Sequence, residues 1–263
     1  MIKFFRHVRK NLLNEGKTSK YFKYAIGEII LVVIGILIAL QINTLNEERK
    51  DRIKEQDILK QLKEEFQSNL LQLENKIEQR NSIINAASNT LAIMDFPNNA
   101  NRDSIMANIS TLTNTPTFDP ITNDLISSGN IRLIKNKDLN KSLTQWTTYI
   151  LQLGEIEQEY VDNYRTIYLP FLMKLGIGRD VDNAYWEIKD NFKFLMDHKE
   201  IEDKPVLSKS PTPIPLTDLL NNKEFESLLS NAIYINYIAN LEAKSLHKRI
   251  LEILDLLNKE IKD

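Results

Sequence analysis

The chain contains no cysteine, which excludes disulfide bonds, thiolate metal sites and cysteine nucleophiles. This absence leaves the redox compartment open. The chain has three histidines, and none has the i, i+4 or HExxH spacing of a helical zinc site: His7, His198 and His247. No GxSxG, Walker or CxxC motif is present either. We therefore expect no metal, no cofactor and no catalytic residue, and predict that the protein is not an enzyme.

Glycine is also scarce, with seven residues in a chain of 263, while 42% of the residues are hydrophobic. A chain with this composition can bury a substantial core but has few turn-forming residues, which favours an all-α fold. The formal net charge is -2, whereas a general nucleic-acid binder needs an excess of Lys and Arg gathered on one face. We therefore expect no nucleic-acid partner.

One long hydrophobic run stands out at residues 24–42, which read YAIGEIILVVIGILIALQI. At a helical rise of about 1.5 Å per residue the run spans roughly 28 Å, close to the hydrocarbon thickness of a bilayer. A cleaved signal peptide is the rival interpretation, but the basic segment before the run is long and no convincing A-x-A site follows. The run therefore predicts one uncleaved transmembrane helix, with the lipid bilayer as a partner.

The charges on the two sides of this run differ. Residues 1–23 carry seven basic residues against the single acid Glu15, whereas acids and bases balance just after the run. The positive-inside rule places residues 1–23 in the cytoplasm and residues 43–263 outside the cytoplasm, in the periplasm if the membrane is a bacterial inner membrane. Phe5, Val8 and Leu12 share one helical face, so the tail is either an amphipathic interfacial helix or a plain topology signal.

Four residues of the hydrophobic run follow steps of four, three and four and so share one helical face: Glu28, Val32, Gly35 and Ala39. Small residues allow close approach of two helix backbones, and residues 35–39 form a small-xxx-small pattern. We therefore expect this face to contact a second transmembrane helix, from another copy or from another membrane protein. Glu28 lies about one turn from the inner boundary, so it either snorkels to the headgroups or serves such a partner.

Residues 43–263 predict an extracytoplasmic helical bundle or coiled coil. The run from residue 43 to Phe96 lacks glycine and proline, with apolar side chains at three- and four-residue steps interrupted by Lys63 and Arg80. This apolar stripe consists of Leu59, Phe66, Leu70, Leu73, Ile77, Ile84, Ala87 and Leu91. Phe96 and Pro97 end the helix, and an irregular stretch follows.

Further helices are predicted beyond this break. A short helix begins after Asp119 and ends at Gly129, a long one begins after Asn136 and is kinked or ended by Pro170, and a shorter one covers about 183–196. A proline-rich linker precedes a final helix over about 217–262. We expect the first and last long helices to form the staves of one bundle. GIGRD at 176–180 lacks the strand context of a dinucleotide loop, so it predicts a helix–helix turn, and Asp180 begins only an incomplete calcium loop.

Two segments together resemble a family of short single-span proteins from Bacteroidota that is uncharacterised. They are YAIGEIILVVIGILIALQIN at 24–43 and TFDPITNDLISSGNIRLIKNKDL at 117–139. The family's usual NNWNE after QIN reads NTLNE here, which removes an interfacial Trp. The resemblance implies an inner-membrane protein with a periplasmic helical domain, and it implies no activity and no site residue.

Two functions remain open at this stage. The first is a non-enzymatic, membrane-anchored envelope protein that self-associates as a scaffold or serves as an accessory subunit of a membrane complex. The second is a periplasmic ligand sensor, in which a helix shift passes through the stalk to a partner protein, since the cytoplasmic tail is short. A sensor predicts a ligand-sized cavity among the bundle helices.

Overall fold

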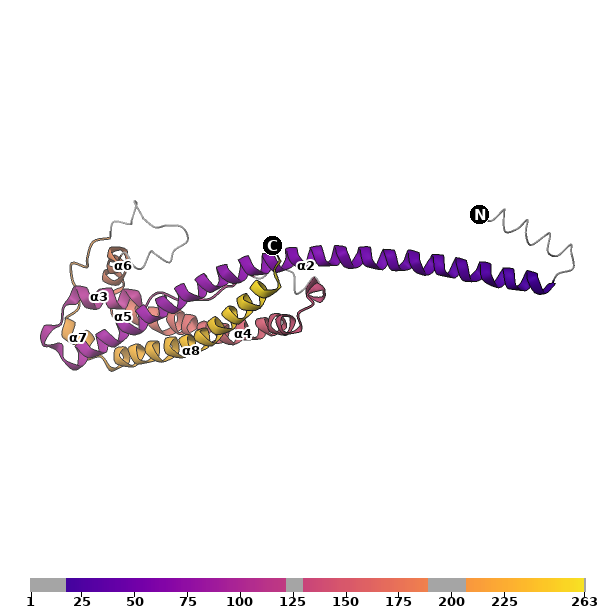
Figure 1. Ribbon diagram of the computed structural model, residues 1–263. Coiled ribbons are helices and arrows are strands. Elements are labelled where there is room, and N and C mark those ends of the chain that lie inside the picture. The colour runs from indigo at the N-terminus through magenta and orange to yellow at the C-terminus, as the bar shows by residue number, and fades with distance from the viewer. Residues whose placement is uncertain (1–17, 122–129, 189–206, 263) are drawn as a thin grey trace. The chain divides into compact units, whose positions relative to one another are not determined.

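The computed structural model describes residues 18–121, 130–188 and 207–262 (Figure 1). The described residues form helices and no strands, which confirms the predicted all-α fold. The helices are, in chain order, α2 (Thr18–Asp95), η1 (Pro97–Asn99), α3 (Arg102–Thr111), η2 (Asn130–Leu133), α4 (Lys137–Asn163), η3 (Tyr164–Tyr168), α5 (Leu169–Lys174), α6 (Gly178–Glu187), α7 (Leu216–Leu220) and α8 (Lys223–Glu260). The chain divides into two compact units, Met1–Ile58 and Leu59–Asp263.

The described part of the first unit belongs to helix α2. Every residue from 29 to 54 is exposed, although residues 29–40 are almost all branched apolar residues, glycine or alanine. This helix is the one in the described residues that is long and apolar enough to cross a membrane, and its most apolar window is not buried inside the protein. The apolar stretch of this helix, residues 24–42, is therefore long enough to cross the hydrocarbon core of a bilayer.

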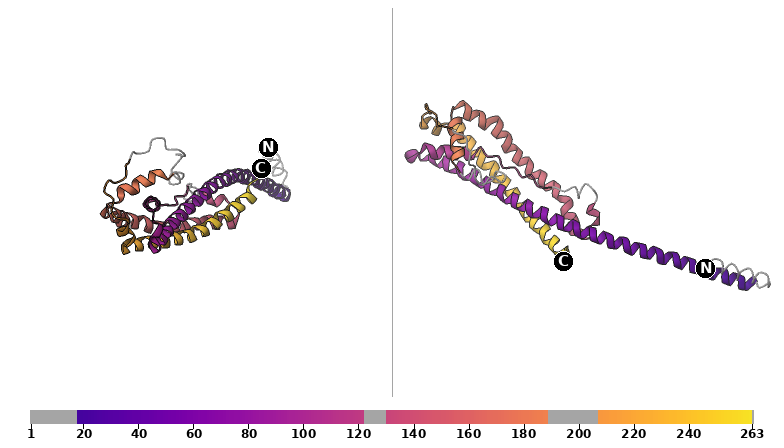
Figure 2. Two further views of the ribbon diagram at one scale, coloured as in Figure 1. Left: turned by 90° about the vertical axis from the view of Figure 1, so that its left-hand side faces the viewer. Right: turned by 90° about the horizontal axis from the view of Figure 1, so that it is seen from above.

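The second unit is built on three long helices that lie side by side, namely α2 from Leu59 onward, α4 and α8 (Figures 1 and 2). Phe66 of α2 packs on Trp146 of α4 with their ring centroids 4.9 Å apart. Asparagines cap the N-termini of two of these three long helices, as the capping preference of asparagine predicts. Asn136 accepts from the backbone N–H of Asp138 and Leu139 at the start of α4, which was predicted, and Asn222 accepts from Phe225 at the start of α8.

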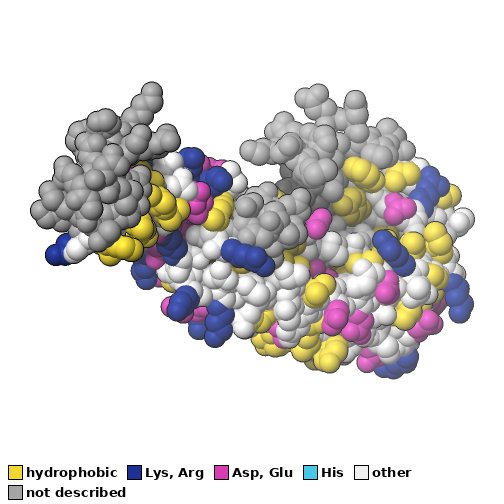
Figure 3. Space-filling model, turned by 90° about the vertical axis from the view of Figure 1, so that its right-hand side faces the viewer, with side chains coloured by type: hydrophobic (Ala, Val, Ile, Leu, Met, Phe, Trp, Pro, Cys, Tyr) yellow, Lys and Arg dark blue, Asp and Glu magenta, His cyan; other side chains and the backbone are white. Residues whose placement is uncertain are grey.

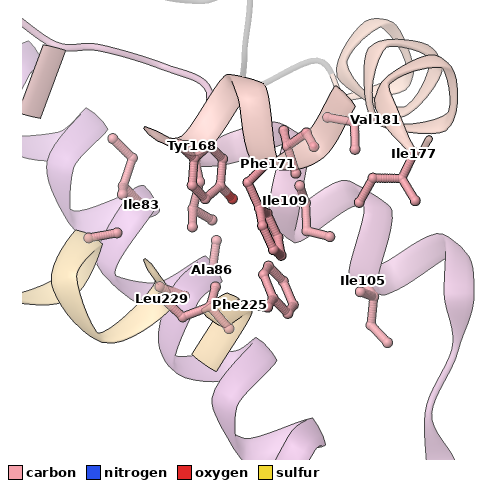
Figure 4. Close-up of a cluster of buried hydrophobic side chains, with 14 of the residues drawn as sticks. Ile83, Ala86, Ile105, Ile109, Tyr168, Phe171, Ile177, Val181, Phe225 and Leu229 are labelled. Carbon is pink, nitrogen blue, oxygen red and sulfur yellow. The ribbon is translucent and has the colours of Figure 1, made fainter. Parts of the chain in front are cut away.

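A large hydrophobic cluster fills one end of this unit (Figure 4). Each of five helices contributes fully buried side chains, among them Ile83 from α2, Ile109 from α3 and Leu229 from α8. Phe171 of α5 and Phe225 of α8 stack with ring centroids 6.0 Å apart. Because each buried apolar side chain contributes on the order of 2 kcal/mol, this cluster is a main source of the unit's stability.

The turn between α5 and α6 is the helix–helix turn that GIGRD predicts. Gly176 has a φ of 69°, a left-handed conformation that favours glycine, and its N–H donates to the carbonyl of Met173. The N–H of Ile177 donates to the carbonyl of Leu172, so the two hydrogen bonds satisfy the last carbonyls of α5.

The predicted apolar stripe of α2 is confirmed at about half of its positions. Leu59, Phe66, Leu73 and Ala87 are buried as predicted, but the intervening positions at 63, 70, 77, 84 and 91 are half-buried. The buried positions between them are instead one residue earlier: Leu62, Asn69, Ile83 and Thr90. The buried polar residues Asn69 and Thr90 do not show in an apolar pattern, whereas Leu62 and Ile83 are apolar and were available to it.

Four element predictions need correction. Helix α3, capped by Asn101, occupies part of the stretch predicted to be irregular. The final helix is two helices, because Asn221 and Asn222 interrupt it between α7 and α8. Pro120 and Ile121 are not helical, and the remainder of that predicted short helix lies outside the described residues. Helix α6 begins at Gly178, earlier than predicted, and the predicted end near residue 196 lies outside the described residues.

Candidate functional site

The predicted membrane interface lies on the exposed part of α2. Val32, Gly35 and Ala39 are exposed and Glu28 is half-buried, and their spacing places all four on one face of the helix. A Cβ atom added at Gly35 would meet no atom within 4 Å, so this face has room for a second helix. Figure 3, which looks toward this end of α2, shows its hydrophobic side chains in yellow at the surface. The contact with a second helix itself stays a prediction.

A buried ion pair joins the three long helices of the second unit. Arg80 of α2 donates to Glu157 of α4, and both side chains are almost fully buried, with 1% and 2% of their surfaces exposed. Arg80 also donates to Asn240 of α8 at 3.4 Å, and the Asn240 amide donates to Asn81 of α2 at 2.9 Å. The polar groups of this layer therefore satisfy one another in the bundle interior.

Burial has a marked electrostatic effect on this layer. It raises the pKa of Glu157, an effect that Arg80 and the N–H of Phe118 only partly offset. It lowers the pKa of Arg80, with Glu157 acting in the opposite direction. Desolvation also lowers the pKa of Lys76, one turn away on α2. The pair therefore contributes less to stability than its charges suggest, while loss of one partner would leave a buried charge without compensation.

An extended segment is held against the bundle by side chains of α2 and α4. Asn69 both donates to the carbonyl of Ile121 at 2.9 Å and accepts from its N–H at 2.8 Å. Gln72 makes the same pair of bonds to Asp119, at 2.9 and 3.1 Å. Just before them in the chain, the N–H of Phe118 donates to Glu157 of α4 at 2.8 Å. Three side chains thus bind the three N–H groups of residues 118–121 and two of their carbonyls.

A second polar contact ties α6 to α3 and to the segment before α7. Asp180 is buried and accepts from Arg102 at 2.8 Å and from the backbone N–H of Ser210 at 2.6 Å. Burial alone would raise the pKa of Asp180, but these hydrogen bonds outweigh it and lower the pKa. Arg102 also donates to the carbonyl of Ile214 at 2.8 Å. The carboxylate of Asp180, the residue that begins the incomplete calcium loop, therefore binds Arg102 and the backbone of Ser210.

A groove of about 360 Å³ lies between η3 and the first part of α8. Helix η3 is a π-helical turn, in which the N–H of Leu169 donates to the carbonyl of Tyr164, and Pro170 follows directly. Tyr160, Tyr164 and Tyr168 line one wall of the groove, and Leu228 and Asn231 line the other. Its volume lies at the lower end of the range of small-molecule pockets, and the ligand sensor itself stays a prediction.

The sequence pattern does not single out the residues of the buried ion pair or of the contacts to residues 118–121. Arg80 was noted as an exception in the apolar stripe, and this was the one available signal, because a polar residue in a core position needs a partner. Asn69, Gln72 and Glu157 gave no signal, since nothing in the local pattern pairs them with segments about 50 to 80 residues away. Among the described residues, no group of three or more His, Cys, Asp or Glu could hold a metal ion.

Comparison with known proteins gives one finding. The model of a family of unknown function, DUF6090, matches residues 28–168. The match begins in the apolar stretch of α2 and ends with the last residue of η3, so it includes the Arg80–Glu157 layer. No curated protein and no solved structure matches the chain. Since the matched region is more than half of the chain, the protein belongs to this family of unknown function, DUF6090.

Proposed function

We propose that this protein is a non-enzymatic, membrane-anchored envelope protein that acts as a self-associating scaffold or as an accessory subunit of a membrane complex. Residues 24–42 anchor it in a bacterial inner membrane, residues 1–23 lie in the cytoplasm, and residues 43–263 form a periplasmic domain. The signature of residues 24–43 and its resemblance to single-span proteins of Bacteroidota support this address.

The observation that carries the proposal is the contrast in exposure along α2. Residues 29–42 present all of their apolar side chains outward, whereas the second unit buries a large hydrophobic core. An exposed apolar helix of this length is stable in lipid and would aggregate in water. Within lipid, the remaining open surface at Gly35 and Ala39 favours contact with another helix, since small residues permit close packing.

The test is the mass and composition of the complex that copurifies with the tagged full-length protein in a mild detergent. A defined homo-oligomer supports a scaffold, and one foreign membrane protein in a fixed ratio supports an accessory subunit. Gly35→Leu should dissociate that complex because the larger side chain separates the two helices. A monomer from wild-type membranes would contradict both forms of the proposal.

Gly27→Leu is the matched control for this experiment. Gly27 also has no atom within 4 Å of an added Cβ, but its position is about 100° away from the predicted face. Both variants add the same apolar side chain to the same hydrophobic run. Loss of the complex in Gly35→Leu alone therefore reports on the face, whereas equal behaviour of the two variants would exclude the interface at Glu28, Val32, Gly35 and Ala39.

A second candidate function is a periplasmic ligand sensor that signals through a partner protein. The specific observation in its favour is the groove between η3 and α8. A ligand there would contact helices of the same bundle as α2, and would change signalling only if it binds two bundle conformations with different affinity. Comparison of the copurified complex with and without a bound ligand distinguishes this candidate from a static scaffold.

A further inference from the structure

A second groove, which we call the α4 groove, runs along helix α4 on the surface of the second unit (α4 is labelled in Figure 1). It has a volume of about 620 Å³, and the residues of α4 that line it fall on successive turns between Ile150 and Asn163. At a rise of about 1.5 Å per residue, these turns cover roughly 20 Å of the helix. The α4 groove is therefore long enough to hold several turns of another helix.

The lining of the α4 groove is mainly apolar. Leu151 has 63% of its surface exposed, Ile150 is half-buried, and Phe118 of the extended segment adds a ring to the lining. A single exposed leucine is ordinary on a protein surface, but these three side chains line one continuous depression. An apolar groove of this kind binds an amphipathic helix through apolar side chains at three- and four-residue steps.

Gly154 lies in the interior of α4, where glycine is among the least favourable residues. A Cβ atom added at Gly154 would meet no atom within 4 Å, so packing among the described residues does not require a glycine there. The missing side chain instead deepens the α4 groove, which Gly154 lines. A glycine at such a point allows the backbone of a docked helix to approach closely.

The charged side chains at the α4 groove are all acidic. Glu155, Glu159 and Asp162 line it, and no basic residue does. Asp162 accepts from Gln158 at 2.8 Å, but none of the three acids forms an ion pair within the described part of the chain. The α4 groove therefore combines an apolar strip with uncompensated negative charge, which is complementary to a partner with Lys and Arg beside its apolar face.

This charge also argues against a second copy of the chain as the occupant. In a symmetric dimer two copies meet through the same surface, so the three acids of one copy would face the same three acids of the other. Like charges brought together in this way oppose association. Anionic lipid headgroups and nucleic acids are disfavoured for the same reason.

We propose that the α4 groove docks a cationic amphipathic helix of a partner protein. Apolar side chains of that helix contact Leu151, its backbone passes over Gly154, and its Lys and Arg side chains pair with the three acids. This inference rests on the accessory-subunit form of the proposed function and deepens it, because it names the kind of partner segment that binds outside the membrane-spanning run.

The experiment uses the full-length protein in nanodiscs of zwitterionic lipid. The probe is a fluorescent helical peptide of about 14 residues, roughly the length of the α4 groove, with leucines at three- and four-residue steps and lysines elsewhere. A twin peptide carries glutamate in place of each lysine. After subtraction of binding to empty nanodiscs, fluorescence anisotropy should show at least tenfold tighter binding of the lysine peptide. Equal affinity for the two peptides would refute the charge complementarity.

Gly154→Leu separates docking from folding. The added side chain fills the α4 groove, so the affinity for the lysine peptide should fall at least tenfold. The melting temperature should stay equal or rise, since leucine is a better helix former and an added Cβ meets no atom. Ser245→Leu is the matched control, because Ser245 is exposed on α8 and does not line the α4 groove. It should leave the peptide affinity unchanged.

Glu155→Lys tests the contribution of the acids. We expect it to weaken binding of the lysine peptide at least fivefold, because it replaces an attraction by a repulsion. Glu64→Lys makes the same change of charge at an exposed position of α2 that does not line the α4 groove, and should change the affinity less than twofold.

The proposal is overturned if Gly154→Leu leaves peptide binding unchanged, if it lowers the melting temperature by several degrees, or if Glu64→Lys and Glu155→Lys weaken binding equally. The peptide titration needs no natural complex, so these results count against the α4 groove alone. A monomer from wild-type membranes in the copurification test would count against the proposed function instead.

Discussion

The apolar stretch of α2 and the helical unit from Leu59 onward differ in where their apolar side chains lie. Residues 29–42 place apolar side chains outside and leave every one exposed, whereas the helical unit buries its apolar side chains together with Arg80, Glu157 and Asn240. In the first region the surrounding solvent decides stability, and in the second the internal partners decide it. A substitution of the same kind should therefore have different effects in the two regions, and this difference can be measured.

The largest contrast is expected from a lysine placed in each region. Leu73 has 0% of its surface exposed, so Leu73→Lys buries an unpaired charge and should destabilise the helical unit by about 5 kcal/mol. Leu37→Lys should leave the unfolding of that unit unchanged, because Leu37 is exposed, and should instead reduce membrane insertion by about 3 kcal/mol. Urea unfolding followed by tryptophan fluorescence measures the first effect and membrane fractionation the second. Equal unfolding curves for the two variants would contradict the comparison.

The second prediction concerns the buried ion pair between Arg80 and Glu157 in the helical unit. Arg80→Met and Glu157→Gln should each cost about 3–5 kcal/mol, because each leaves the other group buried without its partner. The double variant should cost less than either single one, since the glutamine oxygen still accepts from Phe118 and no charge remains. A double-mutant cycle from urea unfolding tests this. Additive costs would show that the two residues do not act as a pair.

The two amides that hold residues 118–121 form a matched pair with different exposure. Asn69→Ala should cost about 2–3 kcal/mol, because Asn69 is fully buried and its loss leaves the N–H and carbonyl of Ile121 without partners. Gln72→Ala should cost less than about 1 kcal/mol, since water can replace its bonds to Asp119. Equal costs would mean that burial does not set the strength of these contacts.

The titration of Asp180 should have a modest effect, between those of Asn69→Ala and Gln72→Ala. Its pKa is lowered in the folded protein, so its contribution is complete above about pH 4, the ordinary Asp value, and is lost as the pH falls through the lower folded value. Asp180→Asn should therefore cost about 1–2 kcal/mol at pH 7, and the difference from wild type should shrink below about pH 4. Melting temperatures of both proteins between pH 2 and pH 8 provide the measurement. A difference that persists unchanged at the lowest pH would refute the assignment to the carboxylate.

The parts that could be predicted from the sequence are those set by local chemistry. The all-α fold follows from the composition, with its few glycines. The break at Pro97, the cap at Asn136 and the turn at Gly176 each follow from the preferences of one residue. The apolar stretch of α2 was likewise visible as a run in the sequence. These features need no knowledge of what lies across the bundle.

The parts that could not be predicted depend on partners distant in the chain. Asn69 and Glu157 look like ordinary surface residues of amphipathic helices, and their partners are residues 118–121 and, for Glu157, also Arg80. The groove depends on a π-turn whose one sequence cue is Pro170, and a proline kink predicts neither a π-turn nor its opposing wall on α8. Helix α3 lies in a stretch that we predicted to be irregular, although Asn101 is a good cap and the buried Ile105 and Ile109 share one helical face.

We propose that residues 24–42 cross a membrane and that the helical unit lies outside the cytoplasm. Introduced cysteines test this topology most directly, because the chain has no cysteine of its own. Lys23→Cys and Asp51→Cys place single thiols at exposed positions on either side of the run. In spheroplasts of a bacterial host, a membrane-impermeant maleimide should label Asp51→Cys at once and Lys23→Cys only after permeabilisation. Labelling of both thiols in intact spheroplasts, or of neither, would contradict the account.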